Sequence, residues 1–291
     1  MLVSWQQTSD TPPSARMASL APSLQPNQRR VIEAIMADRA ATVEYTAQVL
    51  AEQVGVGRTT VIRTAQSLGY DGFPQLRVAL VQELALEQNA SPPADHATSS
   101  KLGELRAGVT NFGVGLAGAT SALTEEALRE CIRLFDEADR VLVIAHGLSS
   151  PLGLDLVQRL NSMGRSAEIQ YDTVSEQIIA HQLGPKSVCF GYSGSGANKA
   201  TLDAMRAAKL GGANVVAMTS FAGSALAEIA DVTLVVPPTS DSFQDELIRT
   251  SRATLMLITE QLVDILIAYR GANGREALLT SLSMLGDALQ E

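Results

Sequence analysis

From Arg140 onward the sequence repeats one pattern: an apolar, β-branched run, a loop of small residues, then an amphipathic segment. The apolar runs predict buried strands, and apolar residues three and four positions apart predict helices. The predicted strands are residues 141–145, 167–171, 187–192, 214–218 and 232–236, with helices at 152–163, 175–181, 199–210 and 224–229. Because such alternation specifies a parallel sheet covered on both faces, we expect a doubly wound α/β domain with a five-stranded parallel sheet.

Three loops of this pattern follow the carboxyl ends of predicted strands, where folds of this class bind ligands. They are residues 146–150, 193–198 and 219–220, and all are rich in hydroxyls and small side chains. In the second loop, Gly194 and Gly196 allow close backbone approach just before a helix whose first N–H groups are unpaired. Such a loop suits an anion, above all a phosphate. Each loop alone also fits a simple Gly/Ser turn, but three at equivalent strand ends favour a binding site.

The amino-terminal third has a helical pattern instead. Residues 27–36 carry an apolar stripe, residues 40–43 are predicted to be a connector, and further helices are predicted at 45–53 and 58–68. A helix of about eight residues, a turn of about four with glycine and a second helix form a helix-turn-helix. The side chains expected to face outward, of types that contact phosphates and base edges, are Arg58, Thr59, Thr60, Arg63 and Gln66. An ordinary helical hairpin with an exposed polar face is the alternative.

Length and composition fit two domains with a substantial core. The chain has 291 residues, of which 46% are hydrophobic. Residues 1–25, rich in Ser, Pro and Gln, are predicted to be a flexible arm, followed by a helix-turn-helix domain at 26–88. Residues 89–122 are predicted to be a linker with a connecting helix, and 123–291 the α/β domain. At the start of the latter, Thr124 is expected to cap a helix.

Charge and cysteine use narrow the class of function. A net charge of −9 argues against a nonspecific polyanion binder but allows a local DNA-reading surface. Cys131 and Cys189 are predicted to be reduced, buried thiols. No apolar run is long enough to cross a bilayer and signal-peptide features are missing, so we expect a cytoplasmic protein with no membrane partner. No His, Asp or Glu group has metal-ligand spacing, so neither a metal nor a cofactor is predicted.

Short motifs in the helix-turn-helix region resemble one family. Thr60-Val-Ile-Arg63, Leu68-Gly-Tyr70 and Gly72-Phe-Pro-Gln-Leu76 resemble the amino-terminal domain of RpiR-type bacterial transcriptional regulators. That family usually has Ser-Pro at the start of the recognition helix, whereas this chain has Gly57-Arg58. Glycine is a tolerable helix cap, so the helix is expected to form, with Arg58 adding a phosphate or guanine contact.

Residues 128–266 resemble the SIS (sugar isomerase) domain of the same regulators. Residues 193–198 occupy the family's Ser-x-Ser-Gly-x-Thr phosphate loop, with Asn198 in place of threonine. Gly147-Leu-Ser149 corresponds to the family's first ligand loop, with Ala145 where glycine is commoner. The resemblance implies a phosphosugar site whose predicted members are Gly147, Ser149, Ser150, Ser193, Ser195, Asn198, Thr219 and Glu246.

A phosphosugar pocket fits either a sensor or an isomerase. An isomerase needs a base, for which the candidates are His146, Glu176, His181 and Glu246. Each also fits a structural or ligand-orienting role, and no catalytic residue is predicted. Because a dedicated isomerase needs no DNA-reading domain, we expect a transcription regulator that senses a phosphorylated sugar or sugar acid; a sugar-phosphate isomerase with a vestigial helical domain is the alternative. Its expected partners are operator DNA, the phosphosugar and further copies of the chain, as a homodimer or homotetramer joined through residues 255–267 or 277–289.

Overall fold

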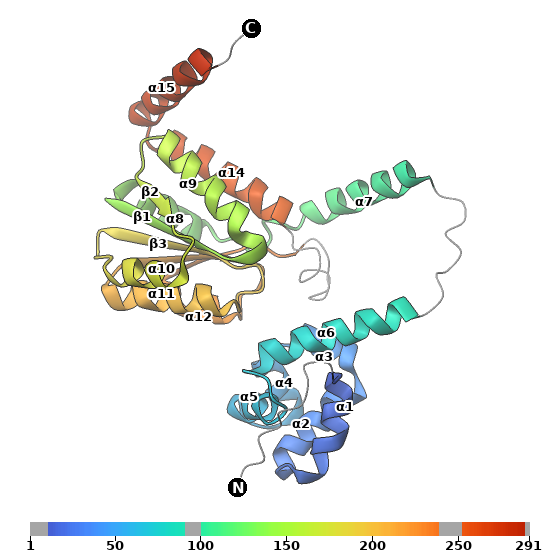
Figure 1. The fold of residues 1–291 in the computed structure, drawn as a ribbon. Helices are drawn as coiled ribbons and strands as arrows, with labels where there is room; N and C mark the ends of the chain where they lie inside the picture. The colour runs from blue at the N-terminus through green and yellow to red at the C-terminus, as the bar shows by residue number, and fades with distance from the viewer. Residues whose placement is uncertain (1–10, 91–99, 239–251, 289–291) are drawn as a thin grey trace. The chain divides into compact units, whose positions relative to one another are not determined.

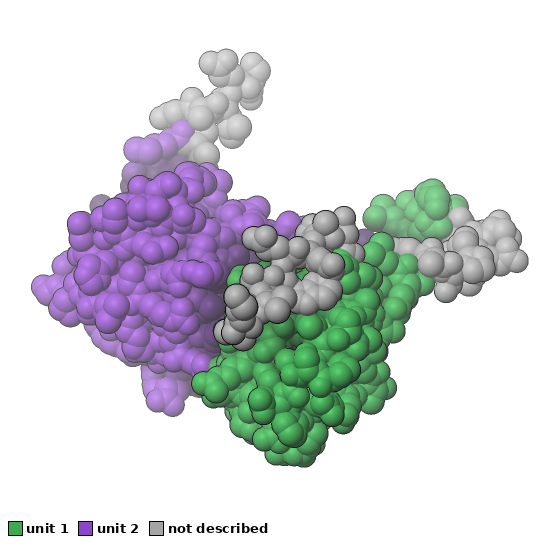
Figure 2. All heavy atoms as spheres, turned by 60° about the horizontal axis from the view of Figure 1, so that its bottom comes forward, with its two compact units in different colours: residues 1–107, 242–247 green, residues 108–241, 248–291 purple. Residues whose placement is uncertain are grey.

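The structure, a computed structural model, describes residues 11–90, 100–238 and 252–288. Its described residues fall into two compact units, one up to Ala107 and one from Gly108 onward (Figure 2). The first unit is helical and the second contains a sheet with helices on both faces (Figure 1). The predicted fold class is therefore confirmed.

The first unit consists of helices, which pack against one another up to Ala90. They are α1 (Pro13–Leu20), α2 (Pro26–Ala37), α3 (Arg39–Glu44), α4 (Ala47–Val54), α5 (Arg58–Ser67), α6 (Phe73–Ala90) and the beginning of α7 (Lys101–Leu116). Val31, Ile35 and Val61 are fully buried in its core. Thr46 caps α4 by accepting a hydrogen bond from Val49 N at 3.2 Å. Gly55 ends that helix with a φ of 69°, so α4 and α5 form the helix-turn-helix.

Two segments of this unit differ from the sequence-based expectation. The described part of the predicted arm, residues 11–25, contains α1 and a 3-10 turn at Ala21–Ser23. Met17 of α1 has no exposed surface, and Ser14 N donates a hydrogen bond to Glu83 Oε1 of α6 at 3.3 Å, so packing orders a segment of unpromising composition. The connector expected at residues 40–43 is part of α3, which Asp38 caps by accepting a hydrogen bond from Ala41 N at 2.8 Å.

The second unit is organised by an entirely parallel sheet. Its strands are β1 (Arg140–Ala145), β2 (Ala167–Ile169), β3 (Ser187–Tyr192), β4 (Asn214–Thr219) and β5 (Val232–Val235), in the order β2-β1-β3-β4-β5. Val143 lies opposite Phe190, which in turn lies opposite Val216. Strand β2 ends at Ile169 instead of residue 171, whereas the other strands agree with the prediction to within one residue.

Helices cover both faces of the sheet (Figure 1). One face packs against α8 (Glu125–Glu137), α9 (Ser150–Ser162) and α14 (Arg252–Tyr269), and the other against α10 (Thr173–His181), α11 (Lys199–Gly211) and α12 (Ala225–Ile229). Helix α15 (Ala272–Ala288) follows α14. The period of two directs Phe190 and Cys189 to opposite faces. The ring of Phe190 lies 5.3 Å from that of Phe135 on α8, which anchors the first face.

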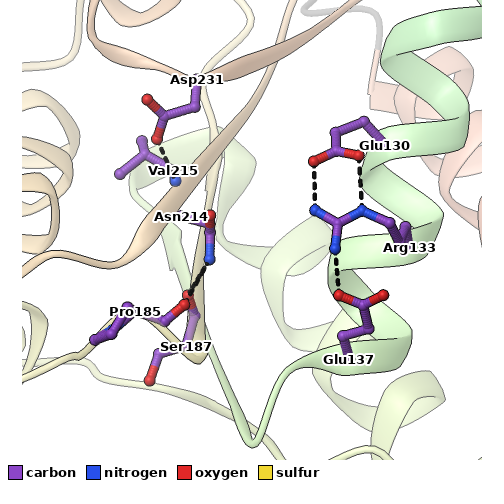
Figure 3. A network of polar contacts seen from close by, with 8 residues as sticks. All are labelled: Glu130, Arg133, Glu137, Pro185, Ser187, Asn214, Val215 and Asp231. Atoms are coloured by element: carbon purple, nitrogen blue, oxygen red, sulfur yellow. Dashed lines mark hydrogen bonds and ion pairs between the residues drawn. The ribbon is translucent and has the colours of Figure 1, made fainter.

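Polar contacts fix helix and strand ends away from the carboxyl edge of the sheet (Figure 3). Asp231, just before β5, accepts a hydrogen bond from Val215 N at 2.9 Å near the amino end of β4. On α8, Arg133 donates to Glu130 at 2.6 Å and also pairs with Glu137. The Asp231 contact thus lies at the amino edge of the sheet, whereas the Arg133 pairs lie within α8.

Candidate functional site

The described helix α5 carries the predicted DNA-reading side chains. Val61 and Ala65 have no exposed surface and hold the helix against the core. Of the predicted set, Arg58, Thr59, Arg63 and Gln66 are exposed, and Thr60 is half-buried. Gly57 precedes the helix without a side-chain cap, and no acidic residue lies in the first turn. The amino-terminal end of the helix and the two guanidinium groups therefore form a surface suited to phosphates.

The loop after β1 supplies the first part of the candidate ligand site. Gly147 has a φ of 57°, a left-handed conformation that lets the chain turn into a 3-10 segment at Gly147–Ser149. Ser149 is buried at 7% exposure. The Ser150 hydroxyl donates to Ala145 O at 3.2 Å, so it ties the start of α9 to the end of β1. Of the two predicted serines, Ser150 therefore has its hydroxyl engaged by the protein.

The loop after β3 is held in place by the segment after β4. Ser193 N donates to Met218 O at 3.1 Å, and Gly194 O accepts a hydrogen bond from Ser220 N at 3.0 Å. Further along, Gly196 O accepts a hydrogen bond from Leu226 N at 3.0 Å. This bonding stretches across the carboxyl ends of two neighbouring strands. It gives the predicted phosphate loop a defined backbone shape.

Asn198 caps the helix that follows this loop. Its Oδ1 accepts a hydrogen bond from Thr201 N at 3.1 Å, so the residue performs the capping role at the start of α11. Ser195, three residues earlier, accepts a weak hydrogen bond from Ala197 N at 3.4 Å and is half-buried. Asn198 itself is exposed. A glycine-containing loop that leads into the start of a helix is an arrangement suited to anions.

Two predicted ligand residues remain, Thr219 and Glu246. Thr219 is fully buried, and its hydroxyl donates to Gly194 O at 3.1 Å. The Thr219 hydroxyl therefore helps to hold the backbone of the loop at residues 193–198. Glu246 lies outside the described residues.

A buried polar cluster adjoins the loop. His146 Nδ1 lies 3.0 Å from Thr201 Oγ1, and His146 Nε2 lies 3.1 Å from Glu176 Oε2. Glu176 is 1% exposed and Thr201 is fully buried. Burial raises the pKa of Glu176 to about 8 and lowers the pKa of His146, so both groups are neutral near pH 7. Thr201 was missed in the sequence, although its position three residues after a cap could have pointed to it.

Other titratable candidates do not join this cluster. His181 is exposed in the last turn of α10, whereas Glu176 lies in the first turn, near the loops. Within the described segments, no group of three His, Cys, Asp or Glu side chains could hold a metal ion. None of the helices in those segments is long and apolar enough to cross a membrane.

Family comparisons agree with both halves of this architecture. Residues 14–87 match the helix-turn-helix domain of the rpiR family, and residues 134–263 match the SIS domain. The chain belongs to the RpiR-type regulators. The first match begins within α1, so the helix that the sequence did not predict is part of the family domain of this RpiR-type chain.

Solved structures share the fold of this RpiR-type chain. NanR of Vibrio vulnificus, complexed with ManNAc-6P, is 19% identical, with a TM-score of 0.77 over 96% of this chain and 100% of that one. The sugar isomerase domain of an RpiR transcription factor from Sphaerobacter thermophilus is 22% identical, with a TM-score of 0.53 over 62% and 96%. A putative sugar-phosphate isomerase of Listeria monocytogenes is 19% identical, with a TM-score of 0.53 over 63% and 98%. At these identities the likeness concerns the fold.

Proposed function

We propose that this protein is a DNA-binding transcriptional regulator whose SIS domain binds a phosphorylated sugar or sugar acid. One observation carries the proposal: a single chain joins a helix-turn-helix unit to a sheet whose carboxyl edge holds a phosphate-type loop. The membership of the RpiR-type family supports the same function. Reading an operator requires access to the chromosome, which supports the predicted cytoplasmic location.

Ligand binding is proposed to change operator affinity through the spacing of two recognition helices. A ligand shifts such an equilibrium only if it binds the two arrangements with different affinity. Residues of the ligand loop sit on rigid elements, because the backbone bonds from Gly194 and Gly196 reach the segment after β4. An anion bound at this loop therefore contacts a backbone of defined shape, and its binding can favour one spacing of the recognition helices.

The experiment that tests the function has a DNA arm and a ligand arm. In the DNA arm, the full chain selects binding sites from a random oligonucleotide pool, and fluorescence anisotropy measures the affinity of each variant. Arg63→Ala should weaken binding tenfold or more and reduce its salt dependence. Arg129→Ala, an equal charge change on exposed α8, is the matched control. Normal binding by Arg63→Ala would show that α5 is not the reading helix.

In the ligand arm, a thermal-shift screen covers phosphosugars, phosphorylated sugar acids and amino-sugar phosphates, including ManNAc-6P. Specific binding to the folded state raises the melting temperature. A hit should be lost in Ser195→Ala and kept in Ser162→Ala, whose exposed hydroxyl lies on α9. An absence of hits across the panel would leave the chain as a regulator without a phosphosugar effector.

A sugar-phosphate isomerase is the second candidate function. The observation in its favour is the neutral, buried carboxyl of Glu176 beside the loop, because a group with a raised pKa suits proton transfer. The exposed His181 at the far end of α10 gives this candidate no support. Incubating wild-type protein with each screen hit and following aldose–ketose conversion by NMR decides the matter. We expect no turnover; conversion at a steady rate without DNA would establish the enzyme.

We further propose that the protein acts as a homodimer or homotetramer, since two-fold operators are read by symmetric pairs. Of the two helices considered, α14 contributes Leu255, Leu262 and Leu266 to the core of its own unit. Helix α15 leaves Leu279 67% exposed and Met284 68% exposed, which supports α15 as the contact with a second copy.

A further inference from the structure

We propose that Glu176 and His146 are positioning residues that orient the Asn198 amide toward the anionic group of the ligand. This inference rests on the proposed function, because it concerns the same site. Four side chains from three parts of the fold carry it: Glu176 on α10, His146 after β1, and Asn198 and Thr201 at the start of α11. We call this set the polar relay.

The polar relay runs from the interior to the surface. Glu176 Oε2 lies 3.1 Å from His146 Nε2, and His146 Nδ1 lies 3.0 Å from Thr201 Oγ1. Thr201 Oγ1 lies 3.3 Å from Asn198 Oδ1. Glu176 and Thr201 are buried, His146 is half-buried and Asn198 is exposed. A change in the protonation of the buried Glu176 carboxyl can therefore be passed through these contacts to the exposed Asn198 amide.

Burial makes His146 the natural partner of Glu176. Neither carboxyl oxygen of Glu176 makes an aligned hydrogen bond to a described residue. Leaving a buried polar group without a hydrogen bond costs about 1–3 kcal/mol. Among the described groups, His146 Nε2 is at hydrogen-bond distance from Oε2. A small adjustment of either side chain would satisfy the carboxyl.

The direction of each hydrogen bond follows from counting donors. Asn198 Oδ1 can only accept, so the single proton of the Thr201 hydroxyl points to it. Thr201 Oγ1 must then accept from His146, which places the ring proton on Nδ1. A neutral ring protonated at Nδ1 accepts at Nε2, so the donor there is the protonated carboxyl of Glu176. The raised pKa of Glu176 is consistent with that protonation state.

This direction determines which way the Asn198 amide faces. Its Oδ1 is held by the backbone N–H and the hydroxyl of Thr201, and its Nδ2 donates to no described residue. Both amide hydrogens therefore point away from α11 and are available for an anion. An asparagine can present either its oxygen or its nitrogen, unlike the threonine that is usual in this loop. The helix cap from Thr201 N and the polar relay together hold the oxygen toward α11 and leave the nitrogen for the ligand.

Ionisation of Glu176 should reverse the polar relay. The pair of Glu176 and His146 then loses one proton to solvent, and the neutral ring carries its proton on Nε2, where it donates to the carboxylate. The Thr201 hydroxyl turns to donate to the unprotonated Nδ1. Asn198 Oδ1 then keeps one hydrogen bond, from Thr201 N. Among the described residues, the Cys189 thiol on β3 also faces Glu176, and burial raises the pKa of this thiol, so it stays protonated. On α11, the exposed Lys199 pairs with Asp203 at 2.6 Å.

The test measures the affinity of the full chain for inorganic phosphate by calorimetry. Glu176→Met removes the donor while keeping a similar volume and should weaken binding about fivefold, the value of one net hydrogen bond. Glu176→Gln keeps a donor for Nε2 and should bind as the wild type does. If Glu176 acted through a negative charge instead, Glu176→Gln would not bind as the wild type does. Thr201→Val is a second interruption of the polar relay and should match Glu176→Met, whereas Thr201→Ser should restore binding.

A pH profile gives an independent readout that needs no destabilising variant. Phosphate affinity of the wild type should fall between pH 7.5 and 9, as Glu176 loses its proton with a pKa of about 8. Glu176→Gln, measured in the same range, should show only the change due to the ligand's own ionisation. Equal affinity of wild type, Glu176→Met and Thr201→Val, or parallel profiles, would overturn the inference alone. No phosphate or phosphosugar binding by the wild type would overturn the ligand site as well.

Discussion

Gly196, in the loop after β3, packs tightly against the start of α12. Its φ of 62° is left-handed, and a Cβ placed there would meet Ser224 at the start of α12. Two constraints therefore coincide at one residue, a backbone conformation and a close approach. Any side chain at this position must disturb the contact that shapes the loop.

Gly196→Ala should lower the free energy of unfolding by about 2 kcal/mol or more, since it adds overpacking to the cost of a left-handed alanine. Gly212→Ala separates the two effects, because Gly212 has a φ of 92° but open space around it, and it should cost about 1 kcal/mol. Urea denaturation of both variants provides the comparison. Equal losses would mean that crowding by Ser224 contributes nothing.

The position of individual loop residues was predictable where they belong to a contiguous motif. Ser193, Ser195 and Asn198 were expected in one loop at a strand end because they follow a clear strand, and their binding role stays a prediction. His146 and Thr201 come together only through the pairing of β1 with β3 and the placement of α11. Because they are far apart in the sequence, no local spacing predicts their contact. Their role in the polar relay required coordinates.

Secondary-structure elements with a strong period were predicted well. Strand β3 matches its predicted bounds because six consecutive residues are buried, as an inner parallel strand requires. Helices α1 and α3 were missed because each is short and depends on contacts made elsewhere in the unit. The burial of Met17 depends on tertiary packing, and the Asp38 cap of α3 is a local contact in a helix too short to show a hydrophobic period.

Removing the anchor of α1 tests its contribution to the first unit. Met17→Ala should destabilise that unit by about 3 kcal/mol, because it empties a fully buried site. Amide hydrogen exchange should rise in α1 and in the part of α6 that holds Glu83, which bonds to Ser14. Ser19→Ala, at an exposed position of the same helix, is the control. Unchanged exchange in α6 would show that α1 is dispensable.

Self-association is a property of the whole molecule. Leu279→Glu combined with Leu282→Glu should convert the proposed homo-oligomer to monomers, because both side chains are more than half exposed on α15 and charge there opposes a buried contact. Sedimentation velocity measures the mass of each species. Leu210→Glu, at a 79% exposed leucine on α11, should leave the oligomer intact. A monomeric wild type would contradict the proposal, and retained association of the α15 variant would move the interface elsewhere.

Both native thiols are sealed inside the second unit. Cys131 and Cys189 have no exposed surface, and burial raises the pKa of each, so neither should react with a maleimide in the folded protein. The two natural cysteines should therefore take up no spin label, and they need not be replaced before a new cysteine is introduced. A cysteine introduced at exposed Gln66 would label the recognition helix alone. Pulsed electron paramagnetic resonance on that oligomer would then measure the distance between two recognition helices directly, with and without a phosphosugar.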